Sequence, residues 1–406
     1  MLLTPREEIE SRIQKFQQEL AGKELDGAVI VLNSDMFYLA GTVQNAQLFV
    51  PAQGEPVLMI RKSLRRGQEE SPLKNVVPMK SVKDMPGILQ SFGYGSMGRI
   101  GLEFDVLPVN NLTTYQRAFP NTAFLDVSPL LRKIRMIKSP FEIEQVRAAM
   151  RILDAGFAEI PRVLREGMRE VELASYLEAA MRRAGLAGNA KMRAFNQDYY
   201  LGNVCVGSSG AMASGMDGSV SGCGLTPAWP QGAGNKIIKR NEVVFVDYVG
   251  VANGYCGDQT REKGERGGRG GPVFCIGQLP PKMEQAFKEA MMINEQMLSI
   301  LKPGTAAEEP YLLAVKIAEE LGYKEHFLGY REDRARFVGH GVGLETDEMP
   351  VFAPGLKNPI VPGMVFALEP KFVFEEGAIG TESTYVMTED GPECLSITPQ
   401  AIGYIE

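Results

Sequence analysis

The sequence predicts a two-domain protein, in which a smaller α/β domain precedes a larger α+β domain with duplicated halves. Three observations support this fold class. The chain has 406 residues and is 44% hydrophobic, so it can bury more than one core. Short apolar strands alternate with helical stretches over the first 133 residues. Beyond them, two segments of the chain resemble each other.

The amino-terminal α/β domain is expected over residues 1–133. Its first helix is predicted from Thr4, Pro5 and Glu7, which match a capping box with proline at the first helical position. Three short apolar runs are the candidate strands of this domain, at residues 27–32, 56–60 and 99–104.

The larger domain is expected over residues 134–406, and a second capping box, at Ser139 and Glu142, starts its first helix. Segments 164–185 and 301–322 share leucine, glycine, glutamate and glycine at matching offsets. Each is followed by a strand pair that carries two acidic residues. These features predict a duplicated α+β half.

The first acidic pair is Asp247 and Asp258, which flank a turn between apolar strands. A four-residue loop over 251–254 would place Asp247 directly opposite Asp258. Side chains at such positions are about 5 Å apart, and like charges there destabilise a sheet. The two acids would then share a proton or bind a cation. In the alternative, the turn lies elsewhere and one acid faces water.

The second acidic pair is Glu369 and Glu382. These residues would face each other if the turn between them falls at residues 375–377. A twofold-like arrangement of the halves would bring both acidic pairs to one centre.

Histidine is rare, since the chain has only His326 and His340. Three glycines surround His340, at positions 339, 341 and 343, and they let the backbone approach closely. Such crowding suits a ligand, so His340 joins the four acids as a candidate. His326 lacks these surroundings and is expected to be structural.

The five candidates are mostly hard oxygen donors, and their four carboxylates match the charge of two divalent cations. Two such ions would activate a water molecule and polarise a carbonyl, which predicts hydrolysis of an amide bond. Oxygen ligation favours Mn²⁺, with Co²⁺, Zn²⁺ or Fe²⁺ as alternatives. A Ser-His-Asp triad is rejected because no GxSxG motif is present. The candidate metal ligands are Asp247, Asp258, His340, Glu369 and Glu382.

The composition of the chain limits the kinds of molecule that it is expected to bind. A formal charge of −7 argues against nucleic acid and anionic membranes as partners. The amino terminus lacks the apolar run of a signal peptide, and no segment reaches about 18 unbroken apolar residues, so a cytoplasmic protein is expected. Five cysteines without a CxxC pair predict neither disulfides nor a zinc knot.

The order of these five residues, with GYxxDxTR at 254–261 and GHGVGLE at 339–345, resembles the creatinase/aminopeptidase P/prolidase (M24) metallopeptidase family. The resemblance covers nearly the whole chain. It implies a "pita-bread" fold for the carboxy-terminal domain and a creatinase N-terminal-like domain before it. The family mostly cleaves peptides beside proline, often as a dimer, so the resemblance implies an Xaa-Pro dipeptidase or aminopeptidase and a homodimer.

The resemblance also implies how the ligands are shared between two metal ions. Asp247 would hold one ion, and His340 with Glu369 would hold the other. Asp258 and Glu382 would bridge both ions.

The chain departs from the family pattern around this centre, because three histidines that catalytic peptidases carry are absent. Their places are taken by Trp229 with Pro230, by Asp347, and by Arg336. The family's EPG has become EPK with Lys371, and the arginine usually found two residues before the last glutamate is Gly380. The substrate-facing residues have therefore changed.

These departures suggest roles for the replacing residues. Asp347 or Glu348 would deliver protons to the leaving nitrogen, with Glu369 as the third catalytic residue. The expected substrate-binding residues are Trp229, Arg336 and Lys371. Alternatively, these residues have no catalytic or binding role: Asp347 and Glu348 form an ordinary acidic rim, and Arg336 forms a salt bridge.

Two other functions are compatible with the sequence. The missing histidines are compatible with a small non-peptide amide as substrate, or with an elimination reaction. A non-catalytic binding protein on the same scaffold is the third possibility, although such a protein has little need for five buried polar groups.

Overall fold

The computed structural model describes residues 2–193, 195–259, 273–396 and 401–406, so Thr260 and Arg261 of the 254–261 motif lie outside the described residues. The chain divides into two compact units: residues 1–135 with 193–196, and residues 136–192 with 197–406. The domain boundary expected after residue 133 falls within helix α6.

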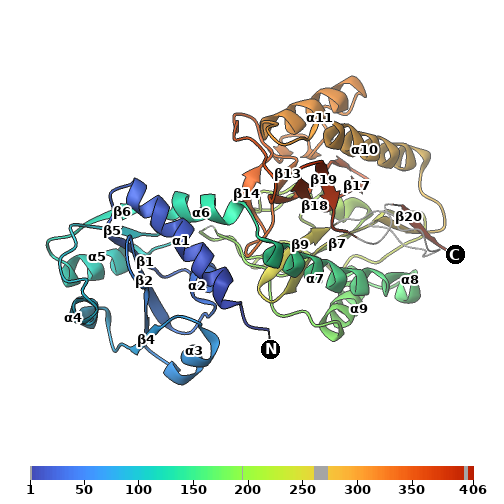
Figure 1. Ribbon diagram of the computed structural model, residues 1–406. Helices are drawn as coiled ribbons and strands as arrows, with labels where there is room; N and C mark the ends of the chain where they lie inside the picture. The colour runs from blue at the N-terminus through green and yellow to red at the C-terminus, as the bar shows by residue number, and fades with distance from the viewer. Residues whose placement is uncertain (1, 194, 260–272, 397–400) are drawn as a thin grey trace. The chain divides into compact units, whose positions relative to one another are not determined.

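The first unit is a six-stranded sheet, with strand order β4-β3-β2-β1-β5-β6, covered by helices (Figure 1). Strands β1, β3 and β5 correspond to the three strands predicted from sequence. The strands are β1 (Gly27–Ile30), β2 (Ala46–Pro51), β3 (Val57–Ile60), β4 (Asn75–Pro78), β5 (Arg99–Leu102) and β6 (Ala123–Asp126). The helices are α1 (Arg6–Gly22), α2 (Asn33–Ala40), α3 (Leu64–Glu70), α4 (Met85–Ser91), α5 (Val109–Ala118) and α6 (Ser128–Met136).

The two predicted capping boxes have different outcomes. Helix α1 begins at Arg6 with Pro5 as its N-cap and makes no side-chain cap, so the box predicted at Thr4 is wrong. Helix α7 (Pro140–Phe157) carries the box as predicted. The Ser139 hydroxyl accepts from the Glu142 N–H at 3.2 Å, and the Ser139 N–H donates to the Glu142 carboxylate at 3.1 Å.

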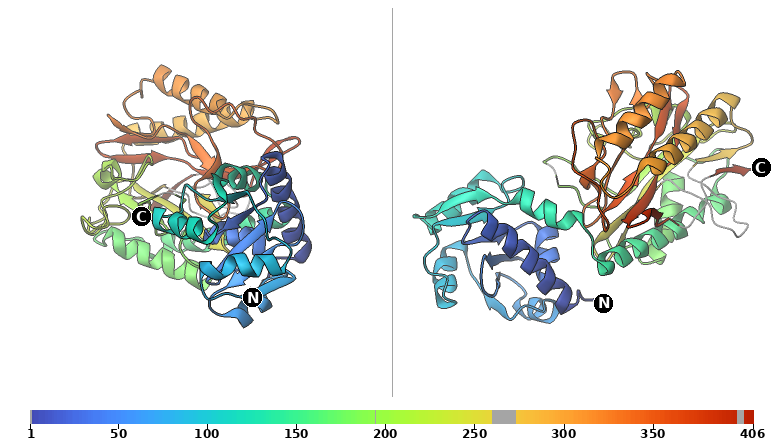
Figure 2. Two further views of the ribbon diagram at one scale, coloured as in Figure 1. Left: turned by 90° about the vertical axis from the view of Figure 1, so that its left-hand side faces the viewer. Right: turned by 45° about the horizontal axis from the view of Figure 1, so that its top comes forward.

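The second unit has its strands between two helix pairs, as the predicted duplication requires (Figures 1 and 2). Helix α7 packs on α9 (Glu170–Arg183) in the first half, and α10 (Pro281–Ile300) packs on α11 (Glu308–Glu320) in the second. A short helix, α8 (Ile160–Val163), joins the first pair. The apolar side of α10 belongs to a core cluster that also contains residues of the carboxy-terminal strands.

Two five-stranded sheets form the centre of the second unit. The first contains β7 (Gly202–Val206), β8 (Val244–Ala252), β9 (Tyr255–Gln259), β10 (Val273–Ile276) and β20 (Ile402–Ile405). The second contains β13 (Gly339–Gly341), β14 (Glu348–Val351), β15 (Val365–Leu368), β18 (Ser383–Thr388) and β19 (Gly391–Cys394). Two hairpins complete the unit: β11 (Gly329–Tyr330) with β12 (Asp333–Arg334), and β16 (Lys371–Phe374) with β17 (Gly377–Gly380).

The glycines around His340 allow strands to pack closely. A Cβ atom at Gly339 would lie 2.3 Å from the Ala367 carbonyl oxygen, and one at Gly341 would lie 2.3 Å from that of Met349. Both distances are too short for any side chain. The glycines thus let β13 lie between β14 and β15 with His340 at its centre.

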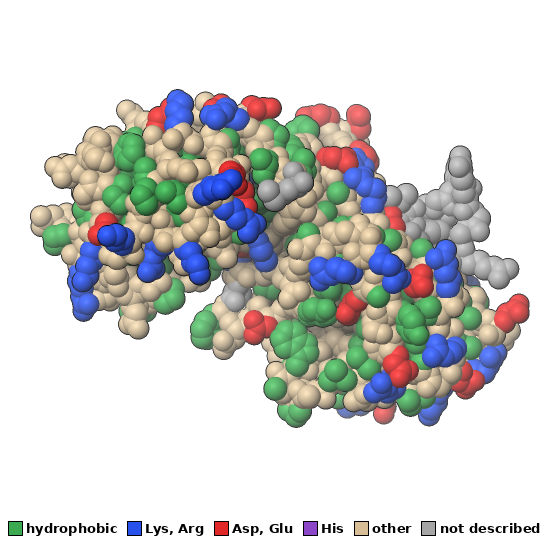
Figure 3. All heavy atoms as spheres, turned by 90° about the horizontal axis from the view of Figure 1, so that it is seen from below, with side chains coloured by type: hydrophobic (Ala, Val, Ile, Leu, Met, Phe, Trp, Pro, Cys, Tyr) green, Lys and Arg blue, Asp and Glu red, His purple; other side chains and the backbone are tan. Residues whose placement is uncertain are grey.

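No helix among the described residues is long and apolar enough to cross a membrane. On the face shown in Figure 3, basic and acidic side chains of the described residues are interspersed.

Candidate metal centre

Four carboxylates and one imidazole meet in a small pocket of the second unit. The pocket has a volume of about 50 Å³, which suits an ion and a water molecule but not a peptide. We call it the acidic pocket. The five residues are buried, each at most 8% exposed. All five ligands predicted from sequence are therefore brought together: Asp247, Asp258, His340, Glu369 and Glu382.

The first acidic pair sits on a hairpin whose register differs from the predicted one. Strands β8 and β9 pair Ala252 with Tyr255, so the loop has two residues, Asn253 and Gly254, both with positive φ. Asp258 lies opposite Val249 and not opposite Asp247, so the predicted four-residue loop is wrong. Because the register differs by two residues, Asp247 and Asp258 still point to the same face of the sheet.

The second acidic pair follows the predicted hairpin. Leu368 pairs with Ser383 on one side, and Lys371 pairs with Gly380 on the other. Both ladders share one register, which places Glu369 opposite Glu382 between them. The turn falls at residues 375–376, because Phe374 pairs with Gly377.

A threonine ties the two halves together beside the acids. The Thr384 hydroxyl on β18 accepts a hydrogen bond from the Asp258 N–H at 3.2 Å and donates one to the Asp258 carbonyl. Strand β9 of the first half is therefore fixed to β18 of the second half at the residue that carries the acid.

The imidazole of His340 is oriented by backbone carbonyls. Its Nδ1 lies 3.1 Å from the carbonyl oxygen of Thr346 and 3.2 Å from that of Gly341. These acceptors favour the proton on Nδ1, which turns Nε2 toward the acids as a ligand atom.

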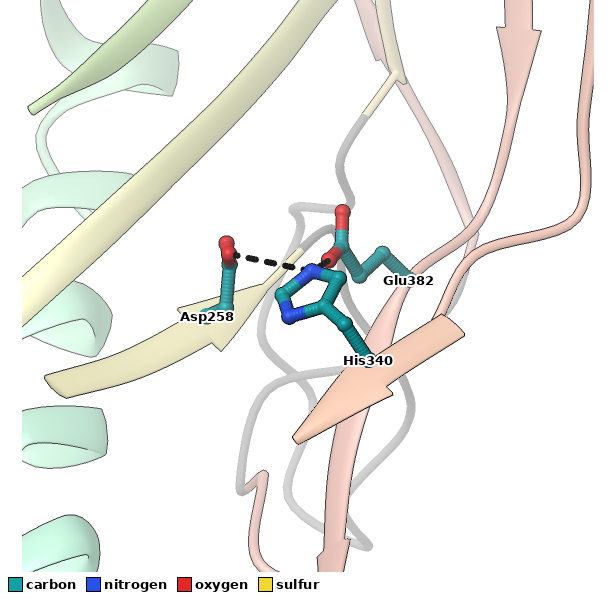
Figure 4. Close-up of side chains that lie close together, drawn as sticks. All are labelled: Asp258, His340 and Glu382. Atoms are coloured by element: carbon teal, nitrogen blue, oxygen red, sulfur yellow. Dashed lines mark ion pairs between the residues drawn. The ribbon is translucent and has the colours of Figure 1, made fainter. Parts of the chain in front are cut away.

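The atoms around Nε2 are spaced as donors to a single ion. Nε2 lies 3.8 Å from Asp258 Oδ2, 3.6 Å from Glu369 Oε1 and 3.9 Å from Glu382 Oε1. Two donors that each bind one ion at about 2.0–2.2 Å can be at most about 4.2 Å apart. Figure 4 shows Asp258, His340 and Glu382 converging from separate strands. These residues fit a divalent ion.

The other side of the acidic pocket contains an ammonium group. Lys371 Nζ lies 2.9 Å from Asp247 Oδ2, 2.8 Å from Glu369 Oε2 and 2.8 Å from Glu382 Oε2. The lysine is only 2% exposed. It was expected to bind a substrate carboxylate, but the structure pairs it with the acids of the centre itself.

The crowding of charge shifts the pKa values of these groups. Burial and Asp247 raise the pKa of Asp258 to about 8, against the influence of His340 and Lys371. Burial lowers the pKa of His340, but Asp347, Glu369 and Asp258 together raise it to about 9. Burial also opposes the charge of Lys371, but Asp247, Glu369 and Glu382 hold its pKa well above the usual value. The pocket therefore favours positive charge among its acids.

The two acids expected to deliver protons lie in different settings. Asp347 lines the acidic pocket, with its side chain 40% exposed and Oδ1 at 3.3 Å from His340 Nδ1. Glu348 is buried, pairs with Lys138 at 3.2 Å and accepts a hydrogen bond from the Glu345 N–H. The geometry supports Asp347 as the group at the pocket rim and gives Glu348 the partners of a structural residue.

A second cavity adjoins the acidic pocket and contains Trp229. It has a volume of about 210 Å³, and Tyr199 and Asn203 line both spaces. Trp229 shares it with three tyrosines and one carboxylate, and we call it the aromatic cavity. Its principal lining residues are Glu178, Tyr199, Tyr200, Trp229 and Tyr248. Arg336 is exposed and lines a different cavity, so within this chain it does not reach the acidic pocket.

Several pocket residues were not identified from the sequence. Tyr199 and Asn203 stand at or before the start of β7 without any motif to mark them. Ser219 lies in the glycine-rich segment 207–234, and its hydroxyl is 3.4 Å from Glu369 Oε2. The glycine-rich composition of this loop was the only signal that pointed to it.

Comparison with known proteins agrees with this architecture. Residues 144–389 match the model of metallopeptidase family M24, and residues 12–137 match the creatinase/prolidase N-terminal domain. The chain is 23% identical to an Xaa-Pro dipeptidase of Pyrococcus furiosus over 398 residues, which cover 97% of this chain and 100% of that protein.

Solved structures share the fold at low sequence identity. An Xaa-Pro dipeptidase from Bacillus anthracis superposes with a TM-score of 0.81 at 21% identity, covering 98% of this chain and 100% of the other. An X-Pro aminopeptidase from Thermotoga maritima gives a TM-score of 0.78 at 22% identity, covering 97% and 99%. Because the family model matches more than half of the sequence, this chain belongs to metallopeptidase family M24.

Proposed function

We propose that this protein is a divalent-metal-dependent peptidase that hydrolyses dipeptides or short peptides, with the Xaa-Pro bond as its default substrate. The observation that carries the proposal is the convergence of four buried carboxylates and His340 Nε2 in one pocket. Membership of family M24 supports the reaction class, and the similarity to Xaa-Pro dipeptidases supports the substrate.

The residues that would hold an ion are Asp258, His340, Glu369 and Glu382. A divalent ion supplies Lewis acidity and lowers the pKa of water to near neutrality. The chain itself positions these donors through the Thr384 and Thr346 contacts. Asp347 is the proposed proton carrier, because it stands at the rim of the pocket beside His340.

The aromatic cavity is the proposed site for a substrate side chain or amino terminus. Its lining includes three tyrosines and Trp229, and it adjoins the acidic pocket at Tyr199 and Asn203. Trp229 would contact the substrate here. Arg336, the third residue predicted to bind substrate, would act only on the part of a ligand that extends to its own cavity.

One carboxylate gives the aromatic cavity a preference for positive charge. Glu178 accepts hydrogen bonds from the hydroxyls of Tyr248, at 3.0 Å, and Tyr200, at 3.3 Å. A carboxylate held among aromatic rings suits an ammonium group, which both the charge and the rings attract. The free amino group of a dipeptide has this chemistry.

The proposed activity is tested with protein reconstituted with Mn²⁺, Co²⁺ or Zn²⁺ and assayed on a panel of Xaa-Pro dipeptides and small carboxylate-bearing amides. We expect cleavage of at least one Xaa-Pro dipeptide, greatest with Mn²⁺. Cleavage of the non-peptide amides alone would replace the peptidase assignment with the alternative substrate class. A family peptidase assayed in parallel controls for the conditions.

Replacing Glu178 by glutamine is expected to raise KM about tenfold for peptides with a free amino group, because the cavity loses its charge but keeps its shape. The KM for amino-terminally acetylated peptides should change little. Steady-state kinetics on both substrate sets measures the difference. Glu172→Gln, on the same helix but outside the lining of the aromatic cavity, is the matched control.

For the reasons drawn from the sequence, we also propose that the ion is manganese, that the protein is cytoplasmic and that it forms a homodimer. Elemental analysis of the purified protein tests the identity of the metal, and light scattering tests the homodimer.

A further inference from the structure

We propose that the ammonium group of Lys371 permanently occupies one of the two cation positions of the acidic pocket, so that this centre binds one divalent ion and not two. This inference rests on the proposed function only in treating the acidic pocket as a cation site. It does not depend on the substrate.

The carboxylate oxygens of the pocket are divided between two positions. Glu369 and Glu382 each direct one oxygen, Oε1, toward His340 and the other, Oε2, toward Lys371. Asp258 completes the first position and Asp247 completes the second. Two shared carboxylates and one unshared carboxylate thus surround each position, and Lys371 Nζ fills the second. The shared pair is Glu369 and Glu382, whereas the family resemblance implies Asp258 and Glu382.

A metal ion cannot share the second position with the ammonium group. Nζ lies 2.8–2.9 Å from three oxygens. An ion bonded to the same three oxygens, at about 2.0–2.2 Å, would overlap the nitrogen. An ammonium group also offers three hydrogens, one for each of these acceptors, so its bonding is complete.

The charge of the pocket is compatible with this arrangement. When all are ionised, the four ligand carboxylates carry four negative charges, of which the ammonium neutralises one and a divalent ion two. One negative charge remains for a second metal ion to offset, but its place among the oxygens is taken. The lysine therefore supplies a cation that no chelator can remove.

The neighbouring strand is shaped to keep Lys371 in place. Gly380 is its partner across the β16–β17 hairpin. A Cβ atom at Gly380 would lie 2.6 Å from Lys371 Cα and 3.0 Å from its Cγ. The ring of Phe245 lies on another side, with its centroid 5.7 Å from Nζ. Both Lys371 and Gly380 depart from the family pattern, and because they are direct partners we interpret them as one coupled change.

The test is metal stoichiometry. Wild-type protein and the variant Lys371→Gly are stripped with a chelator and titrated with Mn²⁺, and bound manganese per chain is measured by elemental analysis after gel filtration. We expect one ion per chain for the wild type and two for Lys371→Gly, because the variant frees three oxygens without adding a side chain.

Two control variants separate charge from space. Lys371→Met removes the charge but keeps the bulk, so it should not gain a second ion. Lys138→Met removes a second buried lysine, which pairs with Glu348 outside the lining of the acidic pocket, and should leave the count at one.

Wild-type protein alone also decides the question if Lys371→Gly fails to fold. Electron paramagnetic resonance of protein loaded with excess Mn²⁺ should show isolated ions, and a spin-coupled manganese pair would overturn the proposal. Two tightly bound ions per wild-type chain would overturn it equally. Because the readout is a count of ions, its failure is distinct from a failure to cleave Xaa-Pro peptides.

Discussion

His340→Ala is expected to lower kcat/KM for the best peptide substrate about 10³-fold, corresponding to about 4 kcal/mol of transition-state stabilisation. The imidazole is the only candidate nitrogen ligand among the described residues that line the acidic pocket, and its Nε2 lies within 4 Å of three carboxylates. Its removal leaves these acids without the donor that completes the ion site. Manganese affinity should fall with the activity, as measured by titration calorimetry.

The chain contains a natural control for this experiment in its second histidine. The ring of His326 makes a contact of 2.9 Å between Nδ1 and the carbonyl oxygen of Val373 and packs on Phe374, and it does not line the acidic pocket. His326→Ala should therefore keep both activity and ion affinity, after any loss of stability is allowed for. If His340→Ala bound manganese as tightly as the wild type, the assignment of the ion site would be wrong.

Asp35→Asn is expected to destabilise the first unit by about 3–5 kcal/mol, because it removes the buried negative charge that two buried arginines share. Asp35 is fully buried. Its carboxylate pairs with Arg135 at 2.6 Å and with Arg193 at 2.5 Å. Urea unfolding, followed by far-UV circular dichroism, measures the loss of unfolding free energy.

The same ion pairs predict how stability depends on pH. Burial tends to raise the pKa of Asp35, but Arg135 and Arg193 outweigh it and lower the value from 3.8 to about 2. A lowered pKa contributes stability above the unfolded value, and this contribution is lost as the pH falls from about 4 to about 2. The acid sensitivity of the wild type in this range should be weaker in Asp35→Asn.

A surface pair is the control for this prediction. Arg65 and Glu69 form an ion pair at 2.8 Å, but their side chains are 92% and 59% exposed. Glu69→Gln should change the free energy of unfolding by less than about 1 kcal/mol. An effect as large as that of Asp35→Asn would show that burial is not the cause.

Local sequence chemistry was sufficient to predict much of the fold, but not every boundary. The Ser139 box formed because its serine and glutamate satisfy each other's backbone N–H groups. The same pattern at Thr4 did not form, and α1 begins one residue later. At the first acidic hairpin, the Asn253–Gly254 pair was a stronger turn signal than the four-residue loop assumed, because asparagine and glycine readily adopt the positive φ that a type I′ two-residue turn requires at both positions.

The site was predictable where alternation along strands decides which face a residue occupies. Asp247 and Asp258 stayed on one face because the error in register was two residues, whereas an error of one would have separated them. The contact of Lys371 with Asp247 could not be predicted, because it depends on how the two halves of the second unit approach each other. Tyr199 and Asn203 were missed because neither belongs to a motif.

Because the candidate ligands come from both halves of the second unit, and the Thr384–Asp258 contact joins these halves, the ion site depends on an intact chain. Residues before α10 supply two of the five candidate ligands, Asp247 and Asp258, and residues after α11 supply the imidazole, the other two ligand carboxylates and the lysine. A polypeptide cut between these helices would therefore give two fragments, neither of which holds a full set of donors. Manganese uptake by the mixed fragments would then report their reassociation, and its rate would measure how fast severed pieces find each other.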